Sequence, residues 1–166
     1  VGGIAVPSSL YPLTLVVFFF ITVIGTPLSG LVVVFGEEYG WRGYLFREWM
    51  GLGPRKASLL VGLVWGIWHA PIILSGVHTY PATLMGLLLG TVFFTLVGFL
   101  FGFAMVKTDS IWVVAFMHGV LNSLYAFIMQ YLIHPEEAIF SFGLGLYGIA
   151  CLGLIGFFAW RDPIWE

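Results

Sequence analysis

The chain has 166 residues, of which 60% are apolar and only 8% are charged, and its mean hydropathy is +1.04. A soluble domain carries about 25% charged residues, so this chain has too few to cover a globule in water. The composition excludes an ordinary soluble enzyme, a nucleic-acid-binding protein and a disordered segment. We therefore expect an integral membrane protein whose main partner is the lipid bilayer.

Long stretches without any charged side chain indicate membrane-spanning helices. They cover residues 1–36, 57–106, 110–135 and 138–160. Each exceeds the roughly 20 helical residues that cross a hydrocarbon core, and none has the alternation of a membrane barrel. We predict an all-α, polytopic transmembrane helix bundle that forms one domain over residues 1–166. Because the chain begins at Val1 rather than Met, further helices upstream of this domain remain an open alternative.

Glycine and proline positions divide the chain into six predicted helices. Their approximate bounds are residues 10–25, 28–50, 55–74, 82–106, 111–133 and 136–160. Pro27 separates the first two helices, because proline disfavours a helical conformation in the residue before it. If the first two helices form one kinked span instead, the bundle has five crossings.

The basic residues indicate the orientation of the bundle. Arg and Lys lie at predicted helix ends on one side, whereas the opposite loops, residues 75–81 and 134–137, contain neither. The basic residues on that side are Arg47, Arg55, Lys56, Lys107 and Arg161. By the positive-inside rule this side is cytoplasmic.

Small residues recur at four-residue spacing in the predicted helices. The pairs are Gly62/Gly66, Gly86/Gly90 and Gly98/Gly102. In lipid, such pairs allow two helix backbones to approach closely. They predict helix packing and carry no information about chemistry.

Ionisable side chains inside a membrane span are costly, so those of the second predicted helix need a reason. Glu38 and Arg42 are four residues apart on one helix face, which predicts an ion pair. Glu37 lies about 100° around the helix, and we expect it to be the unpaired carboxylate of the two. An unpaired, buried carboxylate is suited to act as a general base or acid. The alternatives are that Glu37 pairs with Arg42 or faces a water-filled vestibule.

Two further predicted spans carry polar residues at a similar depth. His69 lies in the third, and Pro71 should loosen the backbone hydrogen bonds just before it. His118 and Asn122 lie four residues apart in the fifth. Counting from the cytoplasmic ends, the depths are about 20 Å for Glu37 and His69, about 17 Å for Asn122 and about 12 Å for His118. Scattered structural residues would not align in this way, so we predict one site.

The polar residues form three short motifs, which follow one another along the chain in separate predicted spans. They are Glu37-Glu38-x-x-x-Arg42, Trp65-x-x-x-His69 and His118-x-x-x-Asn122. In order and placement they resemble the CAAX protease and bacteriocin-processing (CPBP, or Abi) family, which includes the type II CAAX prenyl endopeptidases. The resemblance is specific from about residue 27 to residue 122 and generic elsewhere.

The resemblance implies an intramembrane endopeptidase that acts on a membrane-embedded or lipid-anchored peptide. It further implies a prokaryotic plasma membrane protein whose active site opens to the cytoplasm. By analogy with the family, Glu37 and His69 would activate a water, and His118 and Asn122 would form an oxyanion hole. Glu38, Arg42 and Trp65 would support the site, and no metal or other cofactor would be needed. Trp65 stands where the prenyl-protease branch more often has Phe, so the substrate could equally be a prenylated protein, a bacteriocin or a signalling peptide.

Three alternatives remain open from the residues alone. Zinc could activate the water, with Glu37, His69 and His118 as acceptable ligands, although the chain lacks the His-Glu-x-x-His helix. The same fold could serve as a non-catalytic peptide-binding or immunity scaffold. A proton-coupled transporter could use the Glu and His side chains as a relay, but such a relay has little use for Asn122.

Overall fold

The computed structural model describes residues 8–76, 84–128, 138–140 and 143–166. Within these residues the chain is helical and contains no strand, which confirms the all-α prediction. Its five main helical stretches are Tyr11–Glu48, Pro54–Leu74, Leu84–Thr108, Ile111–Phe127 and Leu146–Trp160. The first three are long and apolar enough to cross a membrane.

The first two predicted helices are one continuous helix, so the predicted break at Pro27 is wrong and the alternative of five helices is confirmed. This long helix comprises α1 (Tyr11–Phe20), η2 (Ile21–Gly25), α2 (Thr26–Glu38), η3 (Tyr39–Leu45) and α3 (Phe46–Glu48). Pro27 is tolerated because it lies in the first turn of α2, directly after the wider π-helical turn of η2. In that turn the Thr26 N–H donates to the Ile21 carbonyl five residues back.

The second helical stretch, Pro54–Leu74, is interrupted at His69, the residue that the sequence analysis places in the site. Helix α4 (Pro54–Trp68) ends at His69, and the short α5 (Ala70–Leu74) follows at once. Pro71 lacks the N–H that would continue the helical hydrogen bonding, which explains the interruption. The predicted loosening before Pro71 is therefore present, and it places the His69 side chain at a helix junction.

The later helices agree with the prediction except at one boundary. Helix α6 (Leu84–Thr108) leads through a turn at Asp109 into α7 (Ile111–Phe127), where the Ser110 hydroxyl accepts a hydrogen bond from the Val113 N–H. Helix α8 (Leu146–Trp160) begins about ten residues later than predicted, because the stretch before it forms a short turn at Ala138–Phe140 and a bend at residues 143–145. Two of the three bend residues are glycines, which have low helix propensity. Residues 82–83, 129–133, 136–137 and 141–142 of the predicted helices lie outside the described residues.

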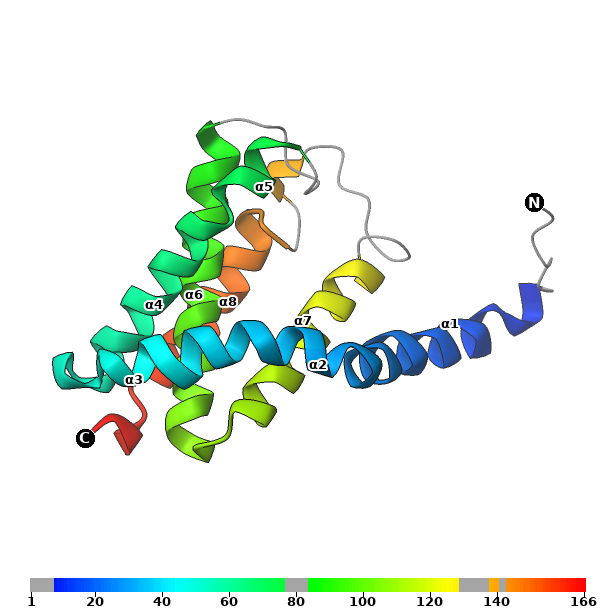
Figure 1. Ribbon diagram of the computed structural model, residues 1–166. Coiled ribbons are helices and arrows are strands. Elements are labelled where there is room, and N and C mark those ends of the chain that lie inside the picture. Colours follow the sequence, from blue (N-terminus) through cyan, green and yellow to red (C-terminus); the bar gives the residue numbers. More distant parts are fainter. Residues whose placement is uncertain (1–7, 77–83, 129–137, 141–142) are drawn as a thin grey trace.

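Helices α4 and α6 run side by side and form the centre of the bundle (Figure 1). Their backbones meet at small residues, as the glycine spacing predicts: Gly62 faces the backbone of Thr95 and Gly98, and Gly102 faces Ser58. Helix α7 packs along α2, and α8 packs along α6 (Figure 1). These pairings bring α2, α4 and α7, which carry the three motifs, to one region of the bundle.

A Gly98→Ala substitution tests this close packing. The added methyl group would meet the Gly62 backbone, so we expect a loss of about 1–3 kcal/mol in the free energy of unfolding. Thermal unfolding in detergent would measure the loss. Gly153→Ala is the matched control, because its methyl group would enter open space on α8 and should cost nothing. Equal melting temperatures for both variants would contradict the packing.

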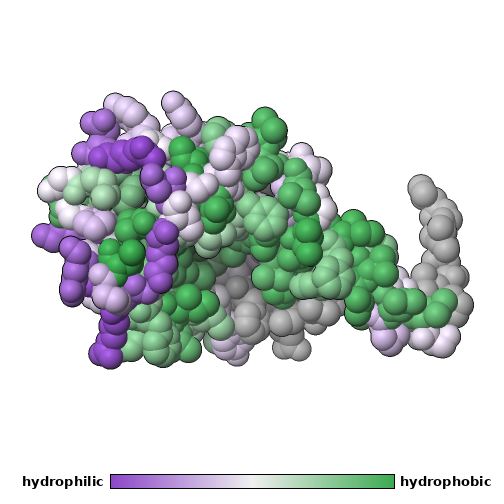
Figure 2. Space-filling view, turned by 90° about the horizontal axis from the view of Figure 1, so that it is seen from below, coloured by the Kyte–Doolittle hydropathy of each residue, from purple (hydrophilic) through white to green (hydrophobic). Residues whose placement is uncertain are grey.

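Hydrophilic residues gather at one end of the molecule, whereas most of the remaining visible surface is apolar (Figure 2). Ion pairs join several helix ends: Arg47 Nη2 lies 3.1 Å from Asp109 Oδ1, and Lys107 Nζ lies 2.7 Å from Asp162 Oδ2. The hydrogen bond from Lys107 lowers the pKa of the Asp162 carboxyl, which keeps that pair charged. At the far end, α1 has no buried residue at all, as expected of an apolar helix that contacts lipid.

Candidate active site

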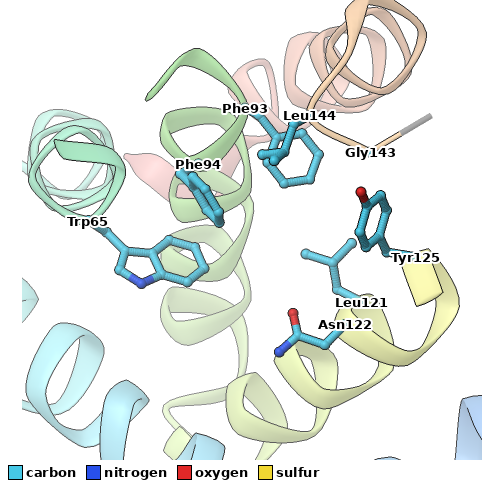
Figure 3. A pocket seen from close by; sticks show the side chains of 8 residues that line it. All are labelled: Trp65, Phe93, Phe94, Leu121, Asn122, Tyr125, Gly143 and Leu144. Carbon is cyan, nitrogen blue, oxygen red and sulfur yellow. The ribbon is translucent and has the colours of Figure 1, made fainter. Parts of the chain in front are cut away.

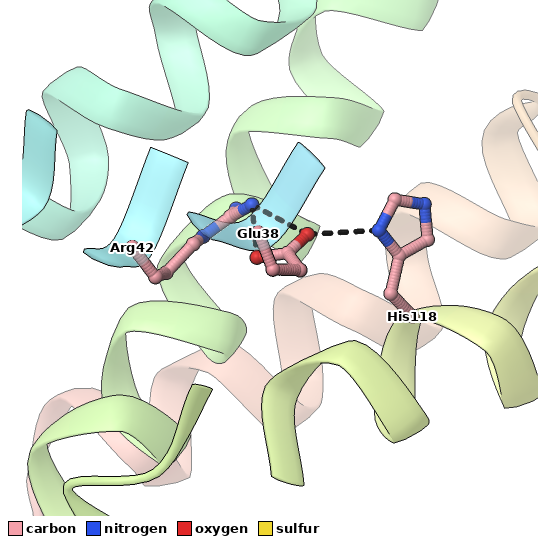
Figure 4. A network of polar contacts seen from close by, with 3 residues as sticks. All are labelled: Glu38, Arg42 and His118. Carbon is pink, nitrogen blue, oxygen red and sulfur yellow. Dashed lines mark hydrogen bonds and ion pairs between the residues drawn. The ribbon is translucent and has the colours of Figure 1, made fainter. Parts of the chain in front are cut away.

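A buried network of three charged or polar side chains joins two of the predicted motifs (Figure 4). Arg42 Nη1 donates to both carboxylate oxygens of Glu38, at 2.8 and 3.0 Å. His118 Nδ1 lies 2.8 Å from Glu38 Oε1. All three side chains are buried, so each polar group depends on the others for its hydrogen bonds. The ion pair between Glu38 and Arg42 follows the prediction, whereas the contact with His118 was not predicted.

Aromatic rings enclose the Arg42 guanidinium. Its carbon lies 4.8 Å from the centre of the Trp65 ring and 5.1 Å from that of Phe101, which are favourable cation–π distances. Gly98 leaves room for the guanidinium, because a Cβ there would lie 3.2 Å from Arg42 Nη2. The Arg42 charge is thus fixed between one carboxylate and two ring faces, away from lipid.

The contact with Glu38 determines how the His118 ring is presented. Because a carboxylate only accepts, the imidazole donates its Nδ1–H to Glu38, and its second nitrogen, Nε2, is left for other contacts. A histidine oriented by a buried carboxylate is the arrangement that hydrolases use to hold a base in place. Glu38 therefore positions His118 as well as neutralising Arg42.

The His69 ring occupies the junction between α4 and α5. Its Nδ1 lies 2.8 Å from the Trp65 carbonyl oxygen, and its ring stacks on Phe94 at 3.7 Å between ring centres. The Trp65 ring lies 5.2 Å from the His69 ring and 5.3 Å from the His118 ring. Trp65 thus contacts Arg42 of the first motif and His118 of the third, as well as His69 of its own motif, and so brings the three motifs into one assembly.

A cavity of about 60 Å³ adjoins this assembly (Figure 3). Asn122 on α7 and Trp65 on α4 line it together with mostly apolar side chains. Those remaining lining residues are Phe93, Phe94, Leu121, Tyr125, Gly143 and Leu144. The cavity therefore offers a few polar atoms in an apolar setting, as ligand sites usually do.

The structure leaves Glu37 and Asn122 outside the hydrogen-bonded network. Glu37 is half-buried on α2 and makes no hydrogen bond or ion pair with a described residue, although it lies near enough to Arg42 for charge attraction. Asn122 is exposed at the cavity and likewise has no hydrogen bond within the described part of the chain. Both side chains are available to a ligand.

The ligand set considered for zinc does not assemble in this structure. Glu37, His69 and His118 do not form a group that could hold a metal ion, and the described residues contain no other group of three such side chains.

The aromatic residues of α6 are the part of the site that sequence reasoning missed. Phe94 stacks on His69, and Phe101 contacts both Arg42 and His118. They are seven residues apart, so they share one helix face, and this spacing is the signal that could have found them. In a chain with 16 phenylalanines that signal is weak.

The fold and the site together define a multi-pass integral membrane protein with a buried polar site. The family of type II CAAX prenyl endopeptidases (Rce1-like) matches residues 12–124, and the chain belongs to this family. The CAAX prenyl protease 2 of Methanococcus maripaludis is 47% identical over 38 residues, which are 22% of this chain and 14% of that protein. The chain thus matches only a small part of that relative's length, and no solved structure matches it significantly.

Proposed function

We propose that this protein is an intramembrane endopeptidase that hydrolyses a peptide bond by means of a water activated by a glutamate, without a metal. The observation that carries the proposal is that, among the described residues, the carboxylate of Glu38 is already hydrogen-bonded, whereas that of Glu37 is not. The two Glu38 oxygens are held by Arg42 and His118, whereas the adjacent Glu37 has no such partner among the described residues. Of the two neighbouring carboxylates, only Glu37 is available to accept a proton from water.

Each polar group of the site has a role in the proposed reaction. Glu37, assisted by His69, takes a proton from the water, whose oxygen attacks the carbonyl carbon of the peptide bond. His118 and Asn122 face the carbonyl oxygen, where negative charge develops. The proton then passes to the leaving nitrogen as the carbon–nitrogen bond breaks. Glu38, Arg42 and Trp65 hold these groups in position.

Family membership and the apolar surface together favour a substrate that reaches the site from the membrane. We propose a lipidated or membrane-embedded peptide, with a prenylated C-terminus as the first candidate because of the family name. The basic residues lie at helix ends on one side of the predicted bundle, which supports a cytoplasmic opening of the site. We place the protein in a prokaryotic plasma membrane.

A cleavage assay in heavy-oxygen water tests the activity. The purified protein in lipid vesicles would be incubated with a farnesylated peptide that ends in a CAAX sequence. We expect two product peptides in mass spectrometry, with one heavy oxygen atom in the new carboxylate, because hydrolysis takes that oxygen from water. Intact peptide after prolonged incubation, alongside correctly folded protein, would overturn the proposal.

Adding a strong zinc chelator to the same assay tests the absence of a metal. We expect the cleavage rate to stay unchanged, since the proposed nucleophile is activated by a carboxylate rather than by a Lewis acid. Loss of activity that returns with added zinc would contradict the glutamate mechanism while leaving the peptidase activity in place.

A further inference from the structure

An apolar groove outside the proposed active site runs between α7 and α8, with α6 as its floor. Its outer and middle parts have volumes of about 590 and 340 Å³, and they adjoin because Leu100 and Met117 line both. Ile155 and Phe158 of α8 line the outer part and are exposed, so the groove opens toward the surrounding lipid. It offers room for an apolar chain that lies along the helices.

The length of the groove matches one leaflet of a bilayer. Lys107, at the end of α6, lines the outer part, and Phe93, fourteen residues earlier on α6, lines an inner part of about 180 Å³. The inner and middle parts adjoin through Leu121 and Leu152. Fourteen helical residues extend over about 21 Å, whereas half of a hydrocarbon core measures about 15 Å. The acyl chain of a lipid in the leaflet on the Lys107 side would therefore fit within the groove.

An ion pair lies at the mouth of this groove. Lys107 Nζ lies 2.7 Å from Asp162 Oδ2, and both side chains line the outer part. Both are partly exposed, and an ammonium with three N–H donors and a carboxylate with several acceptor positions can each bind a second partner. The hydrogen bond from Lys107 lowers the pKa of Asp162, so the pair presents one positive and one negative charge. A headgroup with one anionic and one cationic group complements such a pair.

These charges favour a phospholipid over the lipid chain of a substrate. The inner end of the groove adjoins the cavity of Asn122 through Leu121 and Tyr125, so the chain of a bound substrate would begin there and point outward. Its apolar tip would then meet Lys107 and Asp162, which is unfavourable. A phospholipid has the opposite polarity, with its charges at the mouth and its chain pointing inward.

We propose that this groove binds one phospholipid with a phosphoethanolamine headgroup, whose phosphate accepts a hydrogen bond from Lys107, whose ammonium donates to Asp162 and whose acyl chain lies between α7 and α8. The chain buries apolar side chains that the two helices leave open, and so it stabilises the position of α7, which carries His118 and Asn122. This inference goes beyond the proposed function, because the lipid binds whether or not a peptide is cleaved.

Native mass spectrometry of the detergent-purified protein tests the headgroup. We expect the wild type to retain one phosphatidylethanolamine, and on the order of 10-fold less phosphatidylcholine, whose nitrogen has no N–H to donate to Asp162. Asp162→Asn should lose this preference, although its side-chain oxygen can still accept the Ile164 N–H. Asp109→Asn is the matched control, because Asp109 pairs with Arg47 and does not line the groove. Equal retention of both lipids by the wild type, or a preference for anionic phosphatidylglycerol, would overturn the proposal.

A second pair of variants tests the path of the acyl chain. Ile155→Trp places a bulky ring in the outer part of the groove, and we expect it to lower phosphatidylethanolamine retention on the order of 10-fold. Leu154→Trp is its control, because Leu154 is exposed on the same helix but does not line the groove. Undiminished retention by Ile155→Trp would contradict the proposed path. Displacement of the retained lipid by the farnesylated peptide would assign the groove to the substrate chain and overturn the proposal.

Discussion

A Glu37→Gln protein is expected to lose about 10²–10⁴-fold in kcat, because an amide cannot take the proton from the attacking water. Its melting temperature should match that of the wild type, since Glu37 has no hydrogen bond or ion pair with a described residue to lose. The cleavage assay and thermal unfolding in detergent measure the two effects on the same preparation.

Glu48→Gln is the control for this variant. Glu48 is an exposed carboxylate at the end of the same long helix, so its loss should leave the cleavage rate unchanged. Full activity in Glu37→Gln would exclude Glu37 as the general base and would direct attention to Glu38 or to His69.

Glu38→Ala, unlike Glu37→Gln, is expected to cause a large loss of stability. Removing the carboxylate leaves the Arg42 charge buried without its ion-pair partner, which costs about 3–5 kcal/mol in the free energy of unfolding. Activity should fall as well, because His118 loses the group that orients it. Chemical unfolding in detergent gives the free energy directly.

A double variant, Glu38→Met with Arg42→Met, separates the cost of an unpaired charge from the cost of lost packing. Replacing both members of a buried ion pair by apolar side chains is often nearly neutral, so the double variant should recover most of the stability but none of the activity. A single variant as stable as the wild type would show that the Arg42 charge does not depend on Glu38.

Local sequence spacing accounts for the parts of the site that were predicted correctly. The pair of Glu38 and Arg42 is fixed by a separation of four residues on one helix, and the interruption at His69 is fixed by Pro71 two residues later. The membrane-spanning character follows from composition alone. None of these features requires knowledge of which helices are neighbours.

The features that were missed depend on tertiary packing. His118 lies 80 residues from Glu38, and their contact exists only because α7 packs along α2. Trp65 was expected to support the site, but its contacts with both histidines depend on how α4, α6 and α7 meet. The boundary errors are of a different kind: Pro27 was tolerated by a local widening of the helix, and the glycines before α8 delayed its start.

The uninterrupted helix Tyr11–Glu48 has a consequence for the surrounding bilayer. Its 38 residues extend over about 57 Å, nearly twice the hydrocarbon thickness of roughly 30 Å. Such hydrophobic mismatch is relieved by a steep tilt, by local deformation of the lipid layer or by extension into the headgroups. Glu37 lies about 17 Å before the C-terminal end of this helix. Lipid composition and thickness should therefore influence how readily water reaches the carboxylate, so that the bilayer itself becomes a variable of the reaction.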